Sequence, residues 1–195
     1  MFVQHAMGPD GCPPIRVKCT DADCAHDLHC FLENKKMIRE GKKDGCRYCG
    51  VRPVDWARVH QRNFDDVAYT IRSLNQEFIR YHFWHVAIDQ RAINHARRKG
   101  RVGIREAAEH RLRKSVGSEH PFRDGRQTPF EGNIIYYAQH ATATCCRNCI
   151  YEWHNVPKGR TLTEEEIRYF TNLVKVYINC RLPDLTETGE YVPHL

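Results

Sequence analysis

The sequence contains no long hydrophobic run, although 41% of its 195 residues are hydrophobic. No apolar segment approaches the roughly 20 residues that a membrane-spanning helix needs, so we expect no membrane association. The first residues, MFVQHAMGPDGCPP, also lack the charged-then-apolar pattern of a secretory signal. We therefore expect a cytoplasmic protein.

Alternating polar and apolar residues, the pattern of a β-strand, are nearly absent, and we find no internal repeat. Apolar residues instead recur at helical spacing, as at Val67, Ile71, Leu74, Phe78 and Ile79. Thr163, with Glu166 three residues later, forms a capping box that should begin a last helix. The predicted fold is mostly α: a compact helical body with one or two Cys/His metal (zinc) staples.

Cysteine is missing from the middle of the chain: six of the ten cysteines precede residue 50 and four follow residue 144. In the cytoplasm such bunched cysteines are better explained by metal binding than by a disulfide framework, which is the alternative. We accordingly divide the chain in two. Residues 1–50 should form an irregular arm and a Cys-rich zinc knuckle, and residues 51–195 the helical body.

The N-terminal cysteine group contains a Cys-x2-Cys pair, Cys46 and Cys49, which can present two thiolates to zinc without strain. Zinc takes four sulfur or nitrogen ligands in a tetrahedron. The partners should come from Cys19, Cys24 and Cys30, with His26 and His29 as substitutes. We favour Cys24 and Cys30 and predict a structural zinc site, the alternative being free thiols.

The C-terminal group is denser: Cys146 and Cys149 have the two-residue spacing, and Cys145 and Cys149 can share a helix face. The candidates to complete a site are His140, His154 and Cys180. We predict a second metal set of His140, Cys145, Cys146 and Cys149. Unligated thiols and an iron–sulfur cluster are the alternatives, although ferredoxin spacings do not match. An open fourth position would make the metal catalytic.

Positive charge is concentrated between Arg91 and Lys114. This segment contains nine Lys or Arg residues and only two Glu, and the whole chain has a net charge of +6. Such a stripe attracts polyanions and releases counterions when it binds them. The alternative is a solvated helix face. The expected phosphate contacts include a second basic turn and are Arg97, Arg98, Lys99, Arg101, Lys158 and Arg160.

His82, His85 and Asp89 stand at helical spacing on one face, among the aromatic residues Tyr81 and Trp84. A carboxylate one turn from an imidazole can orient it. This polar row among aromatics could line a pocket where a nucleic-acid base is stacked and read. The alternative is a buried hydrogen-bonded network in a helical core.

A loop in the C-terminal half, beginning with Asp124 and Gly125, places polar groups where they could reach the rim of that pocket. An Asp-Gly turn is also common for purely structural reasons.

The stretch from Asp124 to Ile167 resembles a bacterial family described as a domain of unknown function, number 4186. Its sequence is DGRQTPFEGNIIYYAQHATATCCRNCIYEWHNVPKGRTLTEEEI. The resemblance covers the last third of the chain and implies kinship but no activity.

In size and class the chain is also similar to helical DNA glycosylases, including an antiphage enzyme that removes glucosylated hydroxymethylcytosine. That resemblance implies base flipping and hydrolysis of the N-glycosidic bond in double-stranded DNA, including modified phage DNA. The implied roles are a catalytic carboxylate from Asp89 or Asp124, an acid, base or reader from His82 and His85, and stacking by Tyr81 and Trp84. The alternatives are a zinc-stapled nucleic-acid-binding module without catalysis and a metal-dependent nuclease.

Overall fold

The computed structural model describes residues 17–41 and 44–193, and Cys12 lies outside this part of the chain. The described residues form eight α-helices and two short 3-10 helices, with isolated bridges in place of a sheet. The mostly α prediction is therefore confirmed. The α-helices are α1 (Lys35–Arg39), α2 (Trp56–His60), α3 (Val67–Leu74), α4 (Phe78–His85), α5 (Gln90–Ser115), α6 (Ile134–Ala141), α7 (Arg147–His154) and α8 (Glu164–Arg181).

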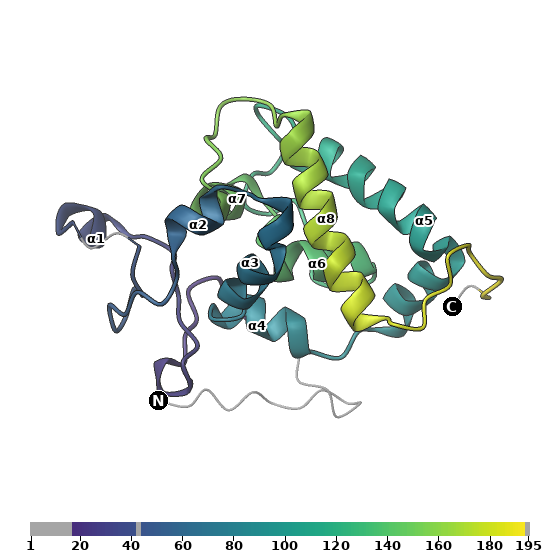
Figure 1. Cartoon of the computed structure of the whole chain (residues 1–195), viewed down its shortest axis with the longest axis horizontal. Coiled ribbons are helices and arrows are strands. Elements are labelled where there is room, and N and C mark those ends of the chain that lie inside the picture. Colours follow the sequence, from purple (N-terminus) through teal and green to yellow (C-terminus); the bar gives the residue numbers. More distant parts are fainter. Residues whose placement is uncertain (1–16, 42–43, 194–195) are drawn as a thin grey trace.

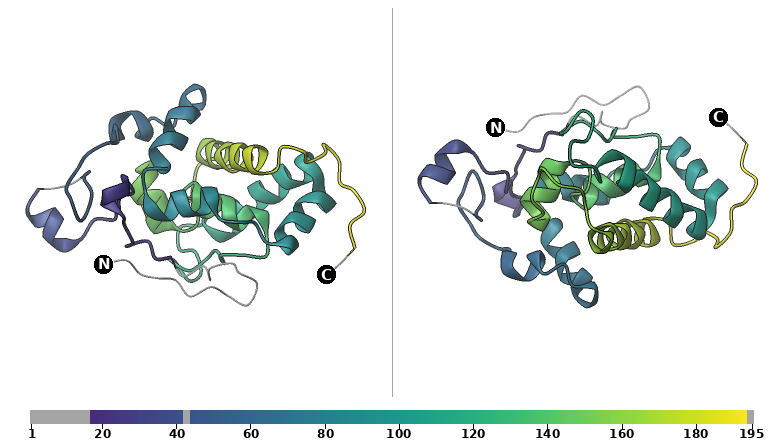
Figure 2. Two further views of the ribbon diagram at one scale, coloured as in Figure 1. Left: turned by 90° about the horizontal axis from the view of Figure 1, so that it is seen from below. Right: turned by 90° about the horizontal axis from the view of Figure 1, so that it is seen from above.

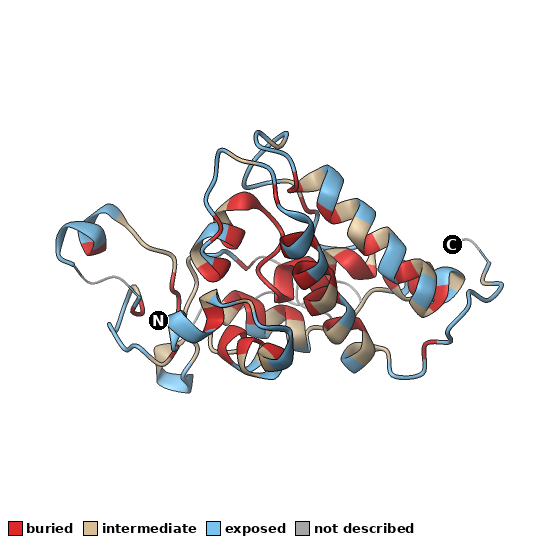
Figure 3. Ribbon diagram, turned by 45° about the horizontal axis from the view of Figure 1, so that its top comes forward, coloured by how far each residue is buried: buried red, intermediate tan, exposed pale blue. Residues whose placement is uncertain are grey.

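Helix α6 lies at the centre of the body, in contact with α4, α5 and α8 (Figure 1). Its sequence, IIYYAQHA, is apolar on nearly every face, and all but one of its residues are buried. A helix that is apolar all round is stable only when other helices surround it. Figure 3 shows the consequence, a buried centre under helices that are exposed on their outer sides.

Helix α8 begins with the predicted capping box, in which Thr163 and Glu166 each bond to the other's main-chain amide. Helix α5 is interrupted at Gly100, whose φ of 64° and ψ of 178° are not helical. A side chain there would meet the main chain of Thr188 and Gly189, because the C-terminal segment passes directly over the kink. Among the described helices, none combines the length and apolar character that crossing a membrane would require.

The described residues between 17 and 50 form a largely irregular segment at the end of the molecule opposite the C-terminal segment (Figure 2). It contains a single 3-10 turn, η1 (Cys24–His26), and the short helix α1. The segment is fastened to the body at the turn before α4. There the His29 amide donates to the Gln76 carbonyl at 2.7 Å, and the Phe78 amide donates to the His29 carbonyl at 2.9 Å.

Candidate metal centre

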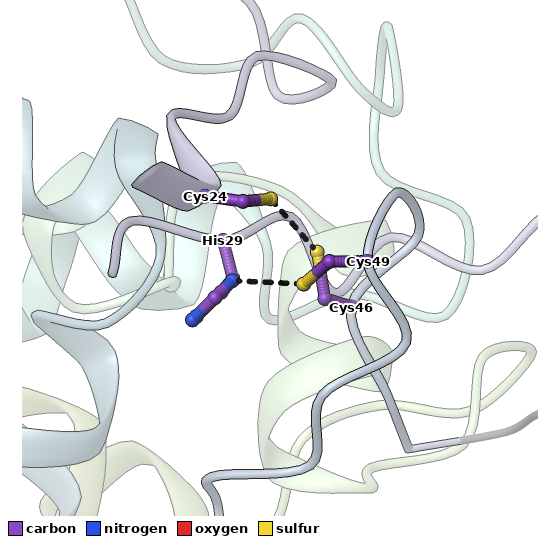
Figure 4. A group of neighbouring side chains, drawn as sticks. All are labelled: Cys24, His29, Cys46 and Cys49. Atoms are coloured by element: carbon purple, nitrogen blue, oxygen red, sulfur yellow. Dashed lines mark hydrogen bonds between the residues drawn. The ribbon is translucent and has the colours of Figure 1, made fainter. Parts of the chain in front are cut away.

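Four side chains of the N-terminal segment converge on one point: Cys24, His29, Cys46 and Cys49 (Figure 4). Their donor atoms all lie within 4.8 Å of one another. Cys24 Sγ is 3.7 Å from Cys46 Sγ, and Cys49 Sγ is 3.5 Å from His29 Nδ1. A tetrahedral zinc ion with ordinary bond lengths requires about 3.8 Å between two sulfurs and about 3.6 Å between sulfur and nitrogen. The group is therefore spaced to hold a tetrahedral metal ion.

The main chain around Cys46 forms a tight knuckle that presents its sulfur to the site. The Tyr48 amide approaches Cys46 Sγ at 3.4 Å, and the Gly50 amide donates to the Cys46 carbonyl at 2.9 Å. Burial opposes ionisation of Cys46, but the main-chain amides of Cys30, Cys49 and Tyr48 outweigh it and lower the pKa of Cys46 to about 6. The thiolate, which is the metal-binding form, is thus favoured at neutral pH.

His29 is oriented by a carboxylate outside the group. Its Nε2 lies 2.8 Å from Asp27 Oδ1, which leaves Nδ1 facing the sulfur of Cys49. The imidazole is 2% exposed, so its position is also fixed by packing. Metal-binding histidines commonly donate their second nitrogen to a carboxylate, which sets the tautomer and makes the ligand more basic. Asp27 has this relation to His29.

Substitution Asp27→Asn should weaken metal binding by about 10–100-fold, because the amide is a poorer acceptor for the imidazole N–H. Competition against a chromophoric chelator measures the affinity. Asp23→Asn is the matched control, since Asp23 bonds to His26, which lies outside the group. Equal affinities for the two variants would show that Asp27 does not strengthen metal binding by His29.

Cys30, which we favoured as a ligand from the sequence, lies outside this group. Its buried sulfur is 3.3 Å from the carbonyl oxygen of Cys19 and donates to it. Burial raises the pKa of Cys30 to about 11, so it stays a neutral thiol. The neighbouring His29, named as a substitute, occupies the fourth place together with the expected Cys24, Cys46 and Cys49.

A second group, Cys145, Cys146 and Cys149, is buried at the start of α7, with its three sulfurs within 4.8 Å of one another. Cys146 is the N-cap of that helix. Hydrogen bonds from Cys145 and Cys146 hold the pKa of Cys149 well below its usual range, and the charge of Arg80 adds to the effect. Arg80 Nη2 donates to Cys149 Sγ at 3.1 Å.

Arg80 connects this thiol group to the centre of the body. Its Nε donates to Glu77 Oε2 at 2.8 Å, and its Nη1 donates to the carbonyl of His140 at 2.7 Å. Glu77 also accepts from Trp153 Nε1 at 2.7 Å. Arg80 and Glu77 are only 2% and 3% exposed. Sequence reasoning missed both residues, and the one available signal was a charge placed among the core positions of a helix.

His140, the predicted fourth ligand of the second group, lies outside it. Its Nε2 lies 3.2 Å from the carbonyl oxygens of Thr128 and Pro129, and its ring stacks on Phe83 with centroids 4.6 Å apart. Burial lowers the pKa of His140 to about 4. The imidazole therefore serves as a neutral core side chain that holds the loop before α6.

Asp89 begins α5 and is the N-cap of that helix. Its Oδ1 accepts from the Ala92 amide at 2.9 Å, and its Oδ2 accepts from the Gly132 amide at 2.7 Å and from the Tyr137 hydroxyl at 3.0 Å. Burial opposes ionisation, but these donors outweigh it and keep the pKa of Asp89 below its ordinary value. Asp89 is thus an ionised carboxylate.

Asp124 belongs to the loop after α5, but its side chain contacts the first turn of α7. Its Oδ1 accepts from the Arg147 amide at 3.1 Å and from the Gly125 amide at 2.9 Å. Asp89 and Asp124 therefore stabilise the first turns of two different helices. Each carboxylate accepts a hydrogen bond from a main-chain amide in the first turn of a helix, which would otherwise lack an acceptor.

The predicted stacking and reading residues divide into exposed and packed side chains. Tyr81 and His85 are exposed and stack on each other, with centroids 3.9 Å apart. Trp84 instead packs edge-on against Tyr177 at 4.8 Å, and the ring of His82 contacts Phe83. Of the two predicted aromatic residues, Tyr81 is thus the one that faces solvent.

The whole basic stripe lies on α5. Lys99 and Arg105 are exposed there, whereas Arg97 pairs with Glu190 at 3.6 Å and Arg101 with Glu187 at 3.6 Å. Arg98 is half-buried on the same helix. In the second basic turn, Lys158 bonds to Asn148 and Arg160 pairs with Glu166 at 2.6 Å.

A hollow of about 410 Å³ lies between α5 and α8. Ile104 and Val174 are among its apolar lining residues, and its charged lining residues are Arg101, Arg105, Lys175 and Glu187. The predicted pocket residues on α4 and in the loop after α5 do not line this hollow. The hollow therefore adjoins the basic residues of α5, and its other wall is formed by α8.

Comparison with known protein families identifies the family to which residues 68–179 are similar. The sequence model of a family described as "Domain of unknown function (DUF4186)" matches residues 68–179. This span runs from α3 to α8 and includes the second thiol group, but it excludes the first. No solved structure matches the chain.

Proposed function

The chain belongs to the DUF4186 family, as its sequence predicted, and from its own side chains we propose that it is a zinc protein that binds DNA. The observation that carries the proposal is the charge of α5. The two helical segments of α5, which meet at the kink at Gly100, together carry nine Lys or Arg residues against two Glu. Double-stranded DNA presents about one negative charge per 1.7 Å of its axis.

The exposed cations support contact with a DNA backbone. Six of the nine basic residues of α5 are exposed: Arg91, Arg97, Lys99, Arg105, Arg113 and Lys114. Two of them already have acidic partners, since Arg97 pairs with Glu190 and Arg113 pairs with Glu109 and Glu164. The exposed Lys175 of α8, which lines the hollow, adds a further cation. Lys and Arg that neutralise phosphates release counterions, which supplies affinity without reading the sequence of the DNA.

Zinc is the metal that suits the donor set of the first centre. Three thiolates and one imidazole in a tetrahedral arrangement form a common structural zinc site. Four protein donors leave no position for a water molecule, which a catalytic metal needs. This favours a structural ion over a metal-dependent nuclease.

The variant Lys99→Gln/Arg105→Gln should weaken DNA binding and make it less salt-dependent. Each lost phosphate contact lowers the slope of log K against log[salt] by about 0.9, so the double variant should lose about 1.8. Fluorescence anisotropy with a labelled duplex at several salt concentrations measures this slope.

The variant Lys35→Gln/Lys36→Gln is the matched control for that experiment. It also removes two exposed cations, but from α1, at the other end of the molecule from α5 (Figure 1). The control should bind like the wild type. Equal slopes for all three proteins would contradict a binding surface on α5.

A second candidate function, base excision, is favoured by the exposed stack of Tyr81 and His85 on α4. An exposed Tyr81–His85 stack precedes an ionised Asp89 carboxylate by four residues. An enzyme that flips a base needs a flat surface to stack it, and a carboxylate can stabilise the positive sugar left when the base departs. Glucosylated hydroxymethylcytosine is the base to test first.

A strand-scission assay on plain and glucosylated phage DNA tests this candidate. Breaks should appear only after hot alkali, only on modified DNA, and equally in EDTA. Asp89→Asn should abolish them, and its amide oxygen can still cap α5. Because the NH2 group of Asn replaces the oxygen that accepts from Gly132 and Tyr137, the circular dichroism of the variant is compared with that of the wild type. Asp124→Asn is the comparison variant. Intact DNA throughout would leave DNA binding without catalysis, and EDTA-sensitive breaks without alkali would indicate a nuclease.

A further inference from the structure

The three cysteines at the start of α7 are gathered closely enough to share one metal ion. Cys145, Cys146 and Cys149 are 4%, 6% and 7% exposed, and their sulfurs lie within 4.8 Å of one another. A zinc ion bound by thiolates holds its sulfurs about 3.8 Å apart, because each Zn–S bond is about 2.3 Å long. A single ion can therefore reach all three sulfurs.

Polar contacts hold the main chain of this group in place. Before it, the Thr128 hydroxyl donates to the Cys145 carbonyl at 2.8 Å. Within it, Asp124 Oδ1 accepts from the Arg147 amide at 3.1 Å. Both partners come from the loop that precedes α6, so the position of the three sulfurs is fixed by tertiary structure as well as by the helix.

The pair Cys146 and Cys149 repeats a feature of the first centre. The Cys149 amide lies 3.5 Å from Cys146 Sγ, as the Tyr48 amide lies 3.4 Å from Cys46 Sγ. In both Cys-x2-Cys pairs a main-chain N–H is thus directed at the first sulfur. Such a contact favours the thiolate, which is the form that binds metal.

The contacts of Arg80 distinguish a thiolate group from three buried thiols, which are also common in apolar cores. Arg80 Nη2 donates to Cys149 Sγ at 3.1 Å, and its Nη1 lies 3.8 Å from Cys145 Sγ. A neutral thiol is a weak acceptor for a buried guanidinium N–H, whereas a hydrogen bond to a thiolate is charge-assisted. The geometry therefore favours sulfurs that carry negative charge.

The charge of Arg80 also favours a divalent ion. Three thiolates around a divalent ion carry a net charge of −1, whereas around a copper(I) ion they carry −2. Arg80 is the buried cation beside them, and it pairs with Glu77 as well. The smaller negative charge is the less costly one to bury in these surroundings.

We propose that Cys145, Cys146 and Cys149 bind one divalent ion of the zinc class through three thiolates, as a second metal centre separate from the first. Three protein donors leave one tetrahedral position to a ligand from outside this group. The second centre lies within the span that the family model matches, whereas the first lies outside it. Its ion would fix the start of α7 against Arg80 of α4.

Counting metals in the purified full-length chain by inductively coupled plasma mass spectrometry tests the proposal. The wild type should hold two zinc ions, and Cys146→Ser and Cys24→Ser should each hold one. Cys146 is the N-cap of α7, and serine is a preferred N-cap, so Cys146→Ser removes a ligand and keeps the cap. Its circular dichroism should match that of the wild type. Cys180→Ser is the matched control and should hold two ions, because the exposed Cys180 belongs to neither group.

The counts also separate this proposal from the first centre. A single ion in the wild type that is lost in Cys24→Ser and kept in Cys146→Ser would retain the first centre and overturn the second. A Cys146→Ser protein that still holds two ions would overturn it too. Copper, or iron with acid-labile sulfide, in place of the second zinc ion would contradict the zinc-class assignment.

Cobalt substitution in the Cys24→Ser background supplies a second readout that does not depend on counting. The single bound Co²⁺ should show thiolate-to-metal charge-transfer bands together with d–d bands. Adding Cys146→Ser should abolish or strongly weaken the charge-transfer bands, and adding Cys180→Ser should leave them unchanged. A Co²⁺ ion without charge-transfer bands would exclude the three thiolates as its ligands.

Discussion

Replacing Arg80 with methionine should destabilise the folded chain by about 3–5 kcal/mol. The guanidinium is buried and is hydrogen-bonded to the Glu77 carboxylate, to the His140 carbonyl and to Cys149 Sγ. Methionine fills part of the space but leaves the carboxylate and the thiol group without a cation. Urea denaturation, compared at the same metal loading, measures the effect as a lower midpoint.

The double variant Arg80→Met/Glu77→Gln separates charge from packing. Removing the carboxylate as well should recover part of the lost stability, because one buried charge no longer lacks a partner. Arg80→Lys should remain destabilised, since an ammonium group does not reproduce the forked contacts of the guanidinium. A midpoint for Arg80→Met equal to that of the wild type would show that this network contributes nothing to stability.

Replacing His29 with alanine should unfold the N-terminal segment while the helical body stays folded. The described residues between 24 and 50 contain only short helical turns, so we expect their order to depend on a bound metal. Metal binding contributes about 10–16 kcal/mol in comparable zinc-finger peptides. Hydrogen exchange followed by mass spectrometry should show lost protection in these residues and retained protection in α6 and α8.

Two further variants give that experiment its controls. His29→Cys restores a zinc ligand at the same place and should recover protection. His26→Ala removes an exposed imidazole outside the four donors and should behave as the wild type. Unchanged exchange in His29→Ala would mean that packing alone orders the segment.

The helical fold was predictable because its signals are local. The spacing of apolar residues and the capping box at Thr163 and Glu166 each act within a few turns of one helix. The family, too, was recognisable from a continuous stretch of sequence. The kink at Gly100 depends on the C-terminal segment that packs against it, so a local pattern does not specify it.

The composition of the two cysteine groups was predictable only in part. The Cys46–Cys49 pair is a local motif. The choice between His29 and Cys30 depends on tertiary structure, because the main chain of His29 pairs with the turn before α4 and its side chain then points to the other three donors. Arg80 signals only that a charge stands among the core positions of a helix. Its partners Glu77, His140 and Cys149 come together only in the folded chain.

X-ray absorption at the zinc edge of the purified chain is the most direct test of the metal centre. We predict a first shell dominated by sulfur at about 2.3 Å, with a minor nitrogen contribution at about 2.0–2.1 Å. The nitrogen contribution should disappear in His29→Cys. A shell made of nitrogen and oxygen alone, or a chain that retains no zinc, would contradict the centre formed by Cys24, His29, Cys46 and Cys49.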